Sequence, residues 1–385
     1  MSARSDLFMG VIHIMRIREF VLTAFLAATV AAGAAAQTPA AIPYDRLAQR
    51  IVSALHLTAG ERVLLRYDPN DLGPLEPVLR QQLEAAGARV ETLNYGPVAD
   101  LQGHLDRTDV YVWLPAGPTA TTPADQREIL AKWLDAGRGR QIHFHWDGGS
   151  RDRDGLLAPH SAELDRRYVD ALDIDYDKLS RDQDRVVAAL RSGEVHVTTP
   201  AGTDLRFRVG DRPFNKQDGD ASLARTKQAR TRVDREIELP AGVLRVAPIE
   251  TSVNGVLVVP AARLLDDARA TDVRLEITAG KVVRATAGTG QAALDAFLAS
   301  GASLRSFREL GIGLNPKLSV TDADAVLPYY GYGDAVVRLS LGDNTELAGD
   351  VRTGGGARWL FFSDTTLTAG SERIIENGRL TPKFR

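Results

Sequence analysis

Helical and strand periodicities alternate between Tyr44 and about Asp147, and this alternation constrains the fold more than any other feature. Apolar residues recur at helical spacing over residues 44–55 and 75–83, while residues 110–114 are apolar on both faces, as in a buried parallel sheet. Helices and strands that follow one another at this cadence predict a doubly wound α/β domain. The expected strands are residues 62–66, 88–93, 110–114 and 141–146.

The apolar pattern changes to a period of two after about residue 192. Residues 195–199 and 205–209 are expected to pair as a hairpin around a Pro-Ala-Gly-Thr segment. A single helix, residues 291–300, interrupts this region. The pattern predicts a β-rich α+β domain over residues 191–385, after an α/β domain over residues 37–190. Further hairpin turns are expected at Asn254-Gly255, Ala279-Gly280 and Asn377-Gly378.

Residues 1–36 have the three parts of a secretory signal peptide. Arg16 and Arg18 precede an apolar stretch that ends in three alanines before Gln37. The stretch is short and rich in alanine, whereas a membrane-spanning helix needs about 20 strongly apolar residues. We therefore expect cleavage near Ala36/Gln37, export to a periplasm, and no membrane association after cleavage.

The composition and the missing motifs exclude several classes of function. The net charge is -3 and no long basic run occurs, so nucleic-acid binding is not expected. The chain has no cysteine, which excludes a thiol nucleophile, a disulfide and lipid attachment. It also lacks a phosphate-binding glycine-rich loop after a strand and a G-x-S-x-G nucleophile motif.

The histidines leave one metal-binding pattern open in the first half of the chain. His143, His145 and Asp147 alternate along an expected strand, so their side chains point to one face and could share a metal. The alternative is a polar strand end with Trp146 packed on the opposite side. No histidine follows His196, so the second half cannot build an ordinary transition-metal site from histidine or cysteine.

Four segments of the second half resemble the thermophilic aminopeptidases of the aminopeptidase T family. They occur in that family's order and spacing, and residues 60–65, 85–90 and 109–112 resemble its opening. The resemblance covers nearly all of the mature chain. It implies a dinuclear metallopeptidase (a hydrolase acting on peptide N-termini), a cleft in the β-rich domain, and a homodimer. The segments are residues 199–205, 247–255, 308–316 and 338–342.

The resemblance also gives the expected metal ligands, and three of the five are replaced. The two glutamates of the family's pattern fall at Glu250 and Glu309. Its two histidines fall at Arg338 and Arg358, and its aspartate falls at Leu360. A tyrosine implicated in the family's catalysis falls at Thr345 if no gap intervenes.

Arginine cannot replace a histidine ligand, because its guanidinium group has no lone pair and stays charged. It can, however, neutralise a carboxylate that has lost its metal, through two parallel hydrogen bonds. We therefore expect Arg338 and Arg358 to form an ion-pair cluster with Glu250 and Glu309, with no metal bound. Divalent Mn, Mg, Co or Zn at the two glutamates is the alternative.

Three functions remain open at this point, above the simple possibility of a structural ion-pair cluster. In the first, the protein binds a peptide or another ligand in the family's cleft without hydrolysing it. In the second, Arg338 and Arg358 form a pocket for a small anionic ligand.

In the third, the protein is an active aminopeptidase with a rebuilt carboxylate site. Glu250 and Glu309 would then act with neighbours such as Asp334, Asp343 or Asp364. An all-oxygen site of this kind favours Mg, Mn or Ca over zinc or cobalt.

Overall fold

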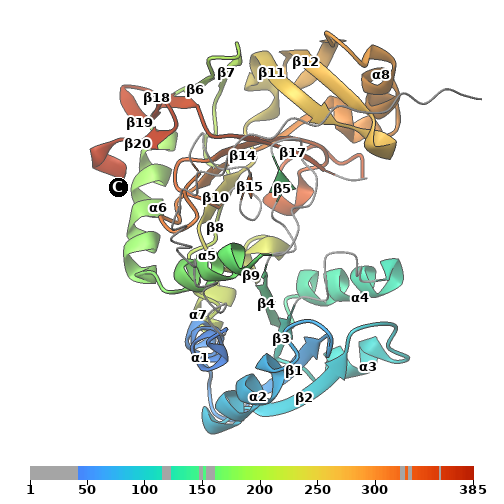
Figure 1. Ribbon diagram of the computed structural model, residues 1–385, viewed down its shortest axis with the longest axis vertical. Helices are drawn as coiled ribbons and strands as arrows, with labels where there is room; N and C mark the ends of the chain where they lie inside the picture. Colours follow the sequence, from blue (N-terminus) through green and yellow to red (C-terminus); the bar gives the residue numbers. More distant parts are fainter. Residues whose placement is uncertain are drawn as a thin grey trace, which may run out of the picture. The chain divides into compact units, whose positions relative to one another are not determined.

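The first half of the chain folds around a five-stranded parallel sheet (Figure 1) with the strand order β2-β1-β3-β4-β9. The computed structural model describes residues 42–114, 123–146, 151–152, 161–320, 326–327, 332–354 and 357–385. The expected signal peptide and Asp147 lie outside these residues. The strands are β1 (Arg62–Tyr67), β2 (Arg89–Asn94), β3 (Val110–Trp113), β4 (Arg140–Phe144) and β9 (Glu236–Leu239).

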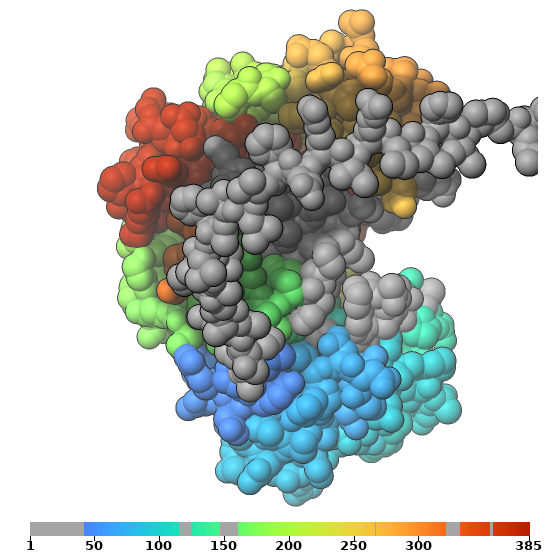
Figure 2. Space-filling view, viewed as in Figure 1, coloured from blue at the N-terminus to red at the C-terminus, as the bar shows by residue number. Residues whose placement is uncertain are grey.

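Helices cover both faces of this sheet because its central strands are apolar on both sides. Val63 and Val112 face the core that contains α1 (Tyr44–Leu55) and α2 (Leu75–Ala85). Leu64 and Tyr111 point the other way, into a second core with residues of α3 (Leu101–Asp106) and α4 (Ala124–Asp135). The surface of this part appears in blue and cyan in Figure 2.

Among the described residues, the second half contains two large antiparallel sheets, and its short strand β15 (Val326–Leu327) also pairs with β5 (Arg151–Asp152). The five-stranded antiparallel sheet carries the candidate site. Its order is β17-β16-β14-β10-β8. Every residue of β14 and β16 is buried, so charged side chains on them must find partners inside the protein. The strands are β8 (Phe214–Lys216), β10 (Val243–Val246), β14 (Phe307–Gly313), β16 (Val337–Leu341) and β17 (Arg358–Phe362).

The other sheet has eight strands in the order β13-β12-β11-β7-β6-β18-β19-β20. Its turns at residues 200–203, 279–280 and 377–378 fall between paired strands, which confirms those three predicted hairpins. Its strands are β6 (Val195–Thr198), β7 (Asp204–Phe207), β11 (Asn254–Arg263), β12 (Arg269–Thr278), β13 (Lys281–Thr286), β18 (Thr366–Ala369), β19 (Glu372–Glu376) and β20 (Arg379–Leu380).

The turn predicted at Asn254-Gly255 is wrong, because these residues begin β11. The chain bends just before them, in the 3-10 helix η2 (Glu250–Ser252). Gly255 instead permits close contact with β7: a Cβ there would lie 2.0 Å from the Asp204 carbonyl oxygen. The glycine thus serves strand packing and not a hairpin.

Two helices connect the halves, α5 (Ala162–Leu172) and α6 (Tyr176–Arg191). Among the described residues, the second half contains the short helix α7 (Leu223–Thr226), which the sequence did not predict, and the expected helix α8 (Gln291–Ala299). The side chains of Ser161 and Asp175 cap α5 and α6 by accepting a backbone N–H in the first turn. No helix among the described residues is long and apolar enough to cross a membrane.

The expected combination of an α/β part and a β-rich part is confirmed. The domain boundary near residue 190 stays a prediction. The chain crosses it more than once, since β9 belongs to the second half in sequence and pairs with β4 of the first.

The packing of the five-stranded antiparallel sheet can be tested at Phe307 of β14. Phe307 on β14 is fully buried, and its ring centroid lies 5.8 Å from that of Phe207. Phe307→Ala is expected to lower the free energy of unfolding by about 3–5 kcal/mol, because it removes apolar contacts and leaves a cavity. Chemical denaturation measures the loss. Val283→Ala is the control, since Val283 is 61% exposed, and its effect should stay within about 0.5 kcal/mol. Equal effects of the two variants would contradict the packing.

Candidate functional site

Glu309 is the most deeply buried acidic residue of the candidate site, and three arginines surround it. Its side chain is 0% exposed. Its Oε2 accepts hydrogen bonds from Arg245 (Nη2 at 2.9 Å) and Arg308 (Nε at 3.4 Å). The Nε of Arg338 lies 2.9 Å from the other oxygen, as an ion pair outside hydrogen-bond geometry. The carboxylate is thus held between cations of the protein itself.

Strand register explains why these groups meet. Gly311 of β14 stands opposite Arg245 of β10 on one side and opposite Arg338 of β16 on the other. Glu309, two residues before Gly311, points to the same face as the two arginines. A Cβ at Gly311 would lie 3.1 Å from the Nε of Arg338. The glycine therefore leaves room for two large guanidinium groups beside one carboxylate.

Glu346 extends this network toward the surface. Its Oε1 lies 2.7 Å from the Nη2 of Arg245 and also accepts a hydrogen bond from Arg308. Arg232 lies 3.5 Å from its other oxygen. We call Arg245, Arg308, Arg338, Glu309 and Glu346 the arginine–glutamate network. It contains three cations and two anions, so its net charge is positive.

The network keeps Glu309 ionised. Burial alone would raise the pKa of its carboxyl group, but the guanidinium groups of Arg245, Arg338 and Arg308 outweigh burial and hold that pKa well below its ordinary value. Burial likewise opposes ionisation of Glu346, and Arg245 and Arg308 lower its pKa. A divalent cation placed here would meet three fixed positive charges.

Glu250 belongs to a separate set of contacts. Its Oε1 accepts hydrogen bonds from the Asn344 side chain and the Asp350 backbone N–H, both at 2.8 Å. Its Oε2 lies 2.6 Å from the Nη2 of Arg212. Asn344 links the two sets, since it also donates to the backbone oxygen of Arg308.

Arg358 does not join Arg338. On the paired strands β16 and β17, Arg338 stands opposite Phe361 and Arg358 stands opposite Leu341. Leu341 is three residues from Arg338, so the two arginines point to opposite faces of the sheet. Arg338 lies over the ring of Trp359, 5.8 Å from its centroid, whereas Arg358 donates to the backbone oxygen of Arg263.

The predicted four-residue cluster must therefore be corrected. The structure brings Arg338 to Glu309 and pairs Glu250 with Arg212. Neither glutamate pairs with Arg358. A single anion pocket between Arg338 and Arg358 is excluded by the same register, because the two side chains leave the sheet in opposite directions.

Among the described residues, Asp334, Asp343 and Asp364 form no group of three potential metal ligands with Glu250 or Glu309. Asp343 accepts hydrogen bonds from Thr345 and from the backbone of Gly354. Asp334 instead lies within electrostatic range of Arg385 and Lys178. Within the described part of the chain, no group of three potential metal ligands contains either glutamate. The residues at the family's metal positions thus do not fit a pair of metal ions.

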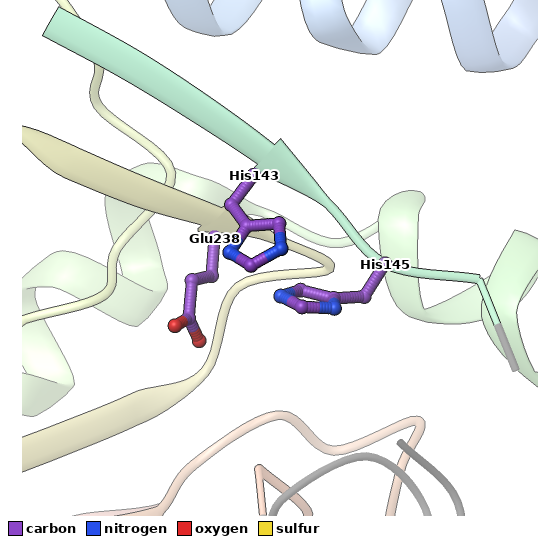
Figure 3. Close-up of side chains that lie close together, drawn as sticks. All are labelled: His143, His145 and Glu238. Carbon is purple, nitrogen blue, oxygen red and sulfur yellow. The ribbon is translucent and has the colours of Figure 1, made fainter. Parts of the chain in front are cut away.

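A second group of residues can hold a metal, and it lies on the parallel sheet. His143, His145 and Glu238 each offer one ligand atom, and these atoms all lie within 4.8 Å of one another (Figure 3). His143 on β4 stands opposite Glu238 on β9, and His145 follows two residues later on the same side. The Nδ1 of His143 lies 3.0 Å from Glu236.

The surroundings of Glu238 and His145 favour their uncharged forms. Burial raises the pKa of the Glu238 carboxyl group. Burial also lowers the pKa of His145 well below its ordinary value, and the neighbouring His143 adds to that effect. The centroids of the two imidazole rings lie 3.9 Å apart, and the rings of Trp113 and His143 pack in a T-shaped arrangement with their centroids 4.3 Å apart. A neutral imidazole is the form that binds metals.

Two adjoining clefts lie beside these groups. The larger, about 570 Å³, extends past the ends of β2 and β3, a common ligand position in open α/β sheets. The smaller, about 390 Å³, is rich in arginine. Leu134 and Arg232 line both. The larger cleft also has Tyr95, Trp113, Glu128, His143 and Glu236 in its wall, and the smaller has Arg230, Arg235 and Glu346.

Several of these residues were not predicted from the sequence. Arg245 could have been noticed, because it interrupts the otherwise apolar strand β10, and Arg308 could have been noticed as a second charge beside Glu309 in a buried strand. Glu346 carried no such signal. Glu238 lies far from His143 in sequence, and only the parallel pairing of β4 with β9 brings them together. The sequence had paired the two histidines with Asp147 instead.

The resemblance to the aminopeptidase T family is confirmed. Residues 173–323 match the model of a family described as thermophilic metalloprotease (M29). The match includes Glu250 and Glu309 and ends before Arg338 and Arg358. Among solved structures, the chain is similar to wild-type AmpT from Thermus thermophilus, with a TM-score of 0.57 and 14% identity over 87% of this chain and 98% of that one. At this identity the likeness shows the fold alone. No curated protein matches the chain in sequence.

The arginine–glutamate network predicts that Glu309 makes a large and pH-dependent contribution to the free energy of unfolding. Glu309→Gln is expected to lower the free energy of unfolding by about 3–5 kcal/mol at neutral pH, since three buried guanidinium groups lose their central anion. The lowered pKa of Glu309 means that the unfolded state binds the extra proton. The stabilisation is therefore complete above the ordinary pKa of 4.5 and is lost as pH falls below it.

Denaturation at a series of pH values checks this expectation. The variant should show a shallower loss of stability below about pH 4.5 than the wild type, by up to about 1.4 kcal/mol per pH unit. Glu372→Gln, which breaks an exposed pair with Lys383, is the matched control. A Glu309→Gln variant as stable as this control would contradict the role of the network.

Proposed function

We propose that this protein, with the aminopeptidase-like fold that its resemblance to the thermophilic metalloproteases (M29) supports, binds a peptide or another small anionic ligand without the family's two-metal hydrolysis. One observation carries the proposal: Glu309, at a metal-ligand position of the family, is fully buried and neutralised by Arg245, Arg308 and Arg338.

The chemistry of two-metal hydrolysis explains why this observation matters. Such sites activate a water molecule and polarise the scissile carbonyl group, and both tasks need ligands with lone pairs. Arg338, Arg358 and Leu360 supply none at the three positions they occupy. A metal bound to Glu309 would also have to displace its guanidinium partners, leaving buried charges unpaired at a cost of several kcal/mol.

The two clefts suggest how a short peptide would bind. Glu128 and Glu236 in the larger cleft offer carboxylates for an ammonium group, and Tyr95 and Trp113 offer apolar surface for a side chain. Arg230, Arg232 and Arg235 line the smaller cleft and suit a carboxylate. The proposed anion site therefore moves from Arg338 and Arg358 to this second set of arginines.

The proposal includes export and self-association. Residues 1–36 would direct export to a periplasm and be removed near Ala36/Gln37, and the mature chain would form a homodimer as the resemblance implies. N-terminal sequencing of the mature protein and light scattering test these two parts. A mature chain that begins at Met1 would contradict the proposed cleavage. A monomer at high protein concentration would contradict the proposed homodimer.

Peptidase and binding assays on the mature protein test the central claim. Added Co, Zn or Mn should produce no release of N-terminal amino acids from short peptides. Calorimetry should detect peptide binding that Trp113→Ala weakens by about tenfold or more, because the indole forms part of the cleft wall. Leu223→Ala is the matched control, since Leu223 is an exposed apolar residue that lines neither cleft.

Two outcomes would overturn the proposal. The first is metal-dependent peptide hydrolysis that Glu250→Gln abolishes, because that result would establish hydrolysis at the metal-ligand position that the family resemblance implies. The second is peptide binding that Trp113→Ala leaves unchanged.

A further inference from the structure

We propose that His143, His145 and Glu238 form a zinc-type site for a divalent cation, with Glu236 orienting His143. This site lies on the parallel sheet and not at the glutamate positions that the family resemblance assigns. It goes beyond the ligand binding proposed above.

The backbone already places the three ligands. His143 and His145 alternate on β4 and its extension, and Glu238 on β9 stands directly opposite His143 in the parallel register. Their ligand atoms lie within 4.8 Å of one another. Ligand atoms about 2.0–2.1 Å from a tetrahedral zinc ion lie about 3.3 Å from one another. Side-chain rotations that move the ligand atoms by about 1 Å would therefore complete the site.

Glu236 supplies a feature that metal-binding histidines commonly share. Its Oε1 lies 3.0 Å from the Nδ1 of His143, which leaves the Nε2 of that ring as the ligand atom. A carboxylate in this place fixes the tautomer and the orientation of the ring. Two other histidines have carboxylate partners, His104 with Glu91 and His196 with Asp204. Neither of those pairs belongs to a group of three potential ligands within the described residues.

The ligand set suits zinc, and it leaves room for a fourth ligand. Two imidazoles and one carboxylate are typical zinc ligands, and three protein ligands leave one position for water or another molecule. His143 and Glu236 both line the larger cleft, so that position would be reached from the cleft. His145 is only 8% exposed, so few water molecules can reach its ring and compete with it for the metal.

The arginine–glutamate network opposes this cation. Arg245 and Arg338 lie within electrostatic range of Glu238 and attract its carboxylate. Zinc binding requires that coordination by the three ligands outweigh the repulsion from these two positive charges. In the alternative, Glu238 only neutralises these arginines and the two histidines bind no metal. Metal titration distinguishes the two cases.

Metal titration of the full chain tests the site. Chelator-treated protein should bind about one equivalent of Zn²⁺ per chain, and Co²⁺ in its place should give the visible absorption of a tetrahedral ion. Glu236→Gln should weaken Zn²⁺ binding by about 10–100-fold, the usual effect of losing a carboxylate that orients a ligand. Loss of a direct ligand, in His145→Gln or Glu238→Gln, should weaken binding by more than that.

His196→Gln is the matched control, because it removes a histidine with a carboxylate partner outside the site. Circular dichroism shows which variants fold. If Glu238→Gln does not fold, Zn²⁺ stoichiometry of the wild type and His145→Gln decide the question. Failure to bind Zn²⁺, or binding unchanged in His145→Gln, would overturn this inference and leave the proposed peptide binding intact. Zn²⁺ lost in Glu250→Gln but kept in His145→Gln would overturn it and also count against the proposed loss of the family's metal centre.

Discussion

Glu309 can be buried only because guanidinium groups reach its carboxylate from three adjacent strands. An isolated charge in such a position costs many kcal/mol, and the partners must come from the protein itself. β10, β14 and β16 supply Arg245, Arg308 and Arg338, and the missing side chain at Gly311 provides the space. The arrangement fixes both the packing of this sheet and the chemistry that it can support.

The same network shapes what its neighbours can do. Its positive charge disfavours metal at Glu309, and it reaches Glu238 on the parallel sheet through Arg245 and Arg338. Glu346 belongs to this network and also lines the smaller cleft, where it pairs with Arg232. One set of ion pairs therefore links Glu309, the histidine pair and the proposed ligand site.

The sequence was sufficient for the combination of an α/β part with a β-rich part and for part of the site. Alternating helix and strand patterns predicted β1, β2, β3 and β4 of the parallel sheet but not β9. Motif resemblance marked Glu309 and Arg338. The face on which Arg358 projects could not be predicted, because it depends on the register of β16 with β17. Glu238 was missed for a related reason: its neighbour in space, His143, belongs to a strand almost a hundred residues earlier. Local patterns give strands, and long-range register decides which side chains meet.

The return of β9 to the first sheet has a consequence for how the chain is made. During synthesis, β4 emerges from the ribosome long before β9, and its outer edge has no β-strand neighbour until residue 239 has been added. An unpaired strand edge readily pairs with other chains, and contacts distant in sequence slow folding. The first sheet thus cannot mature as an independent cotranslational unit, and the histidine–glutamate group forms only when that late strand arrives.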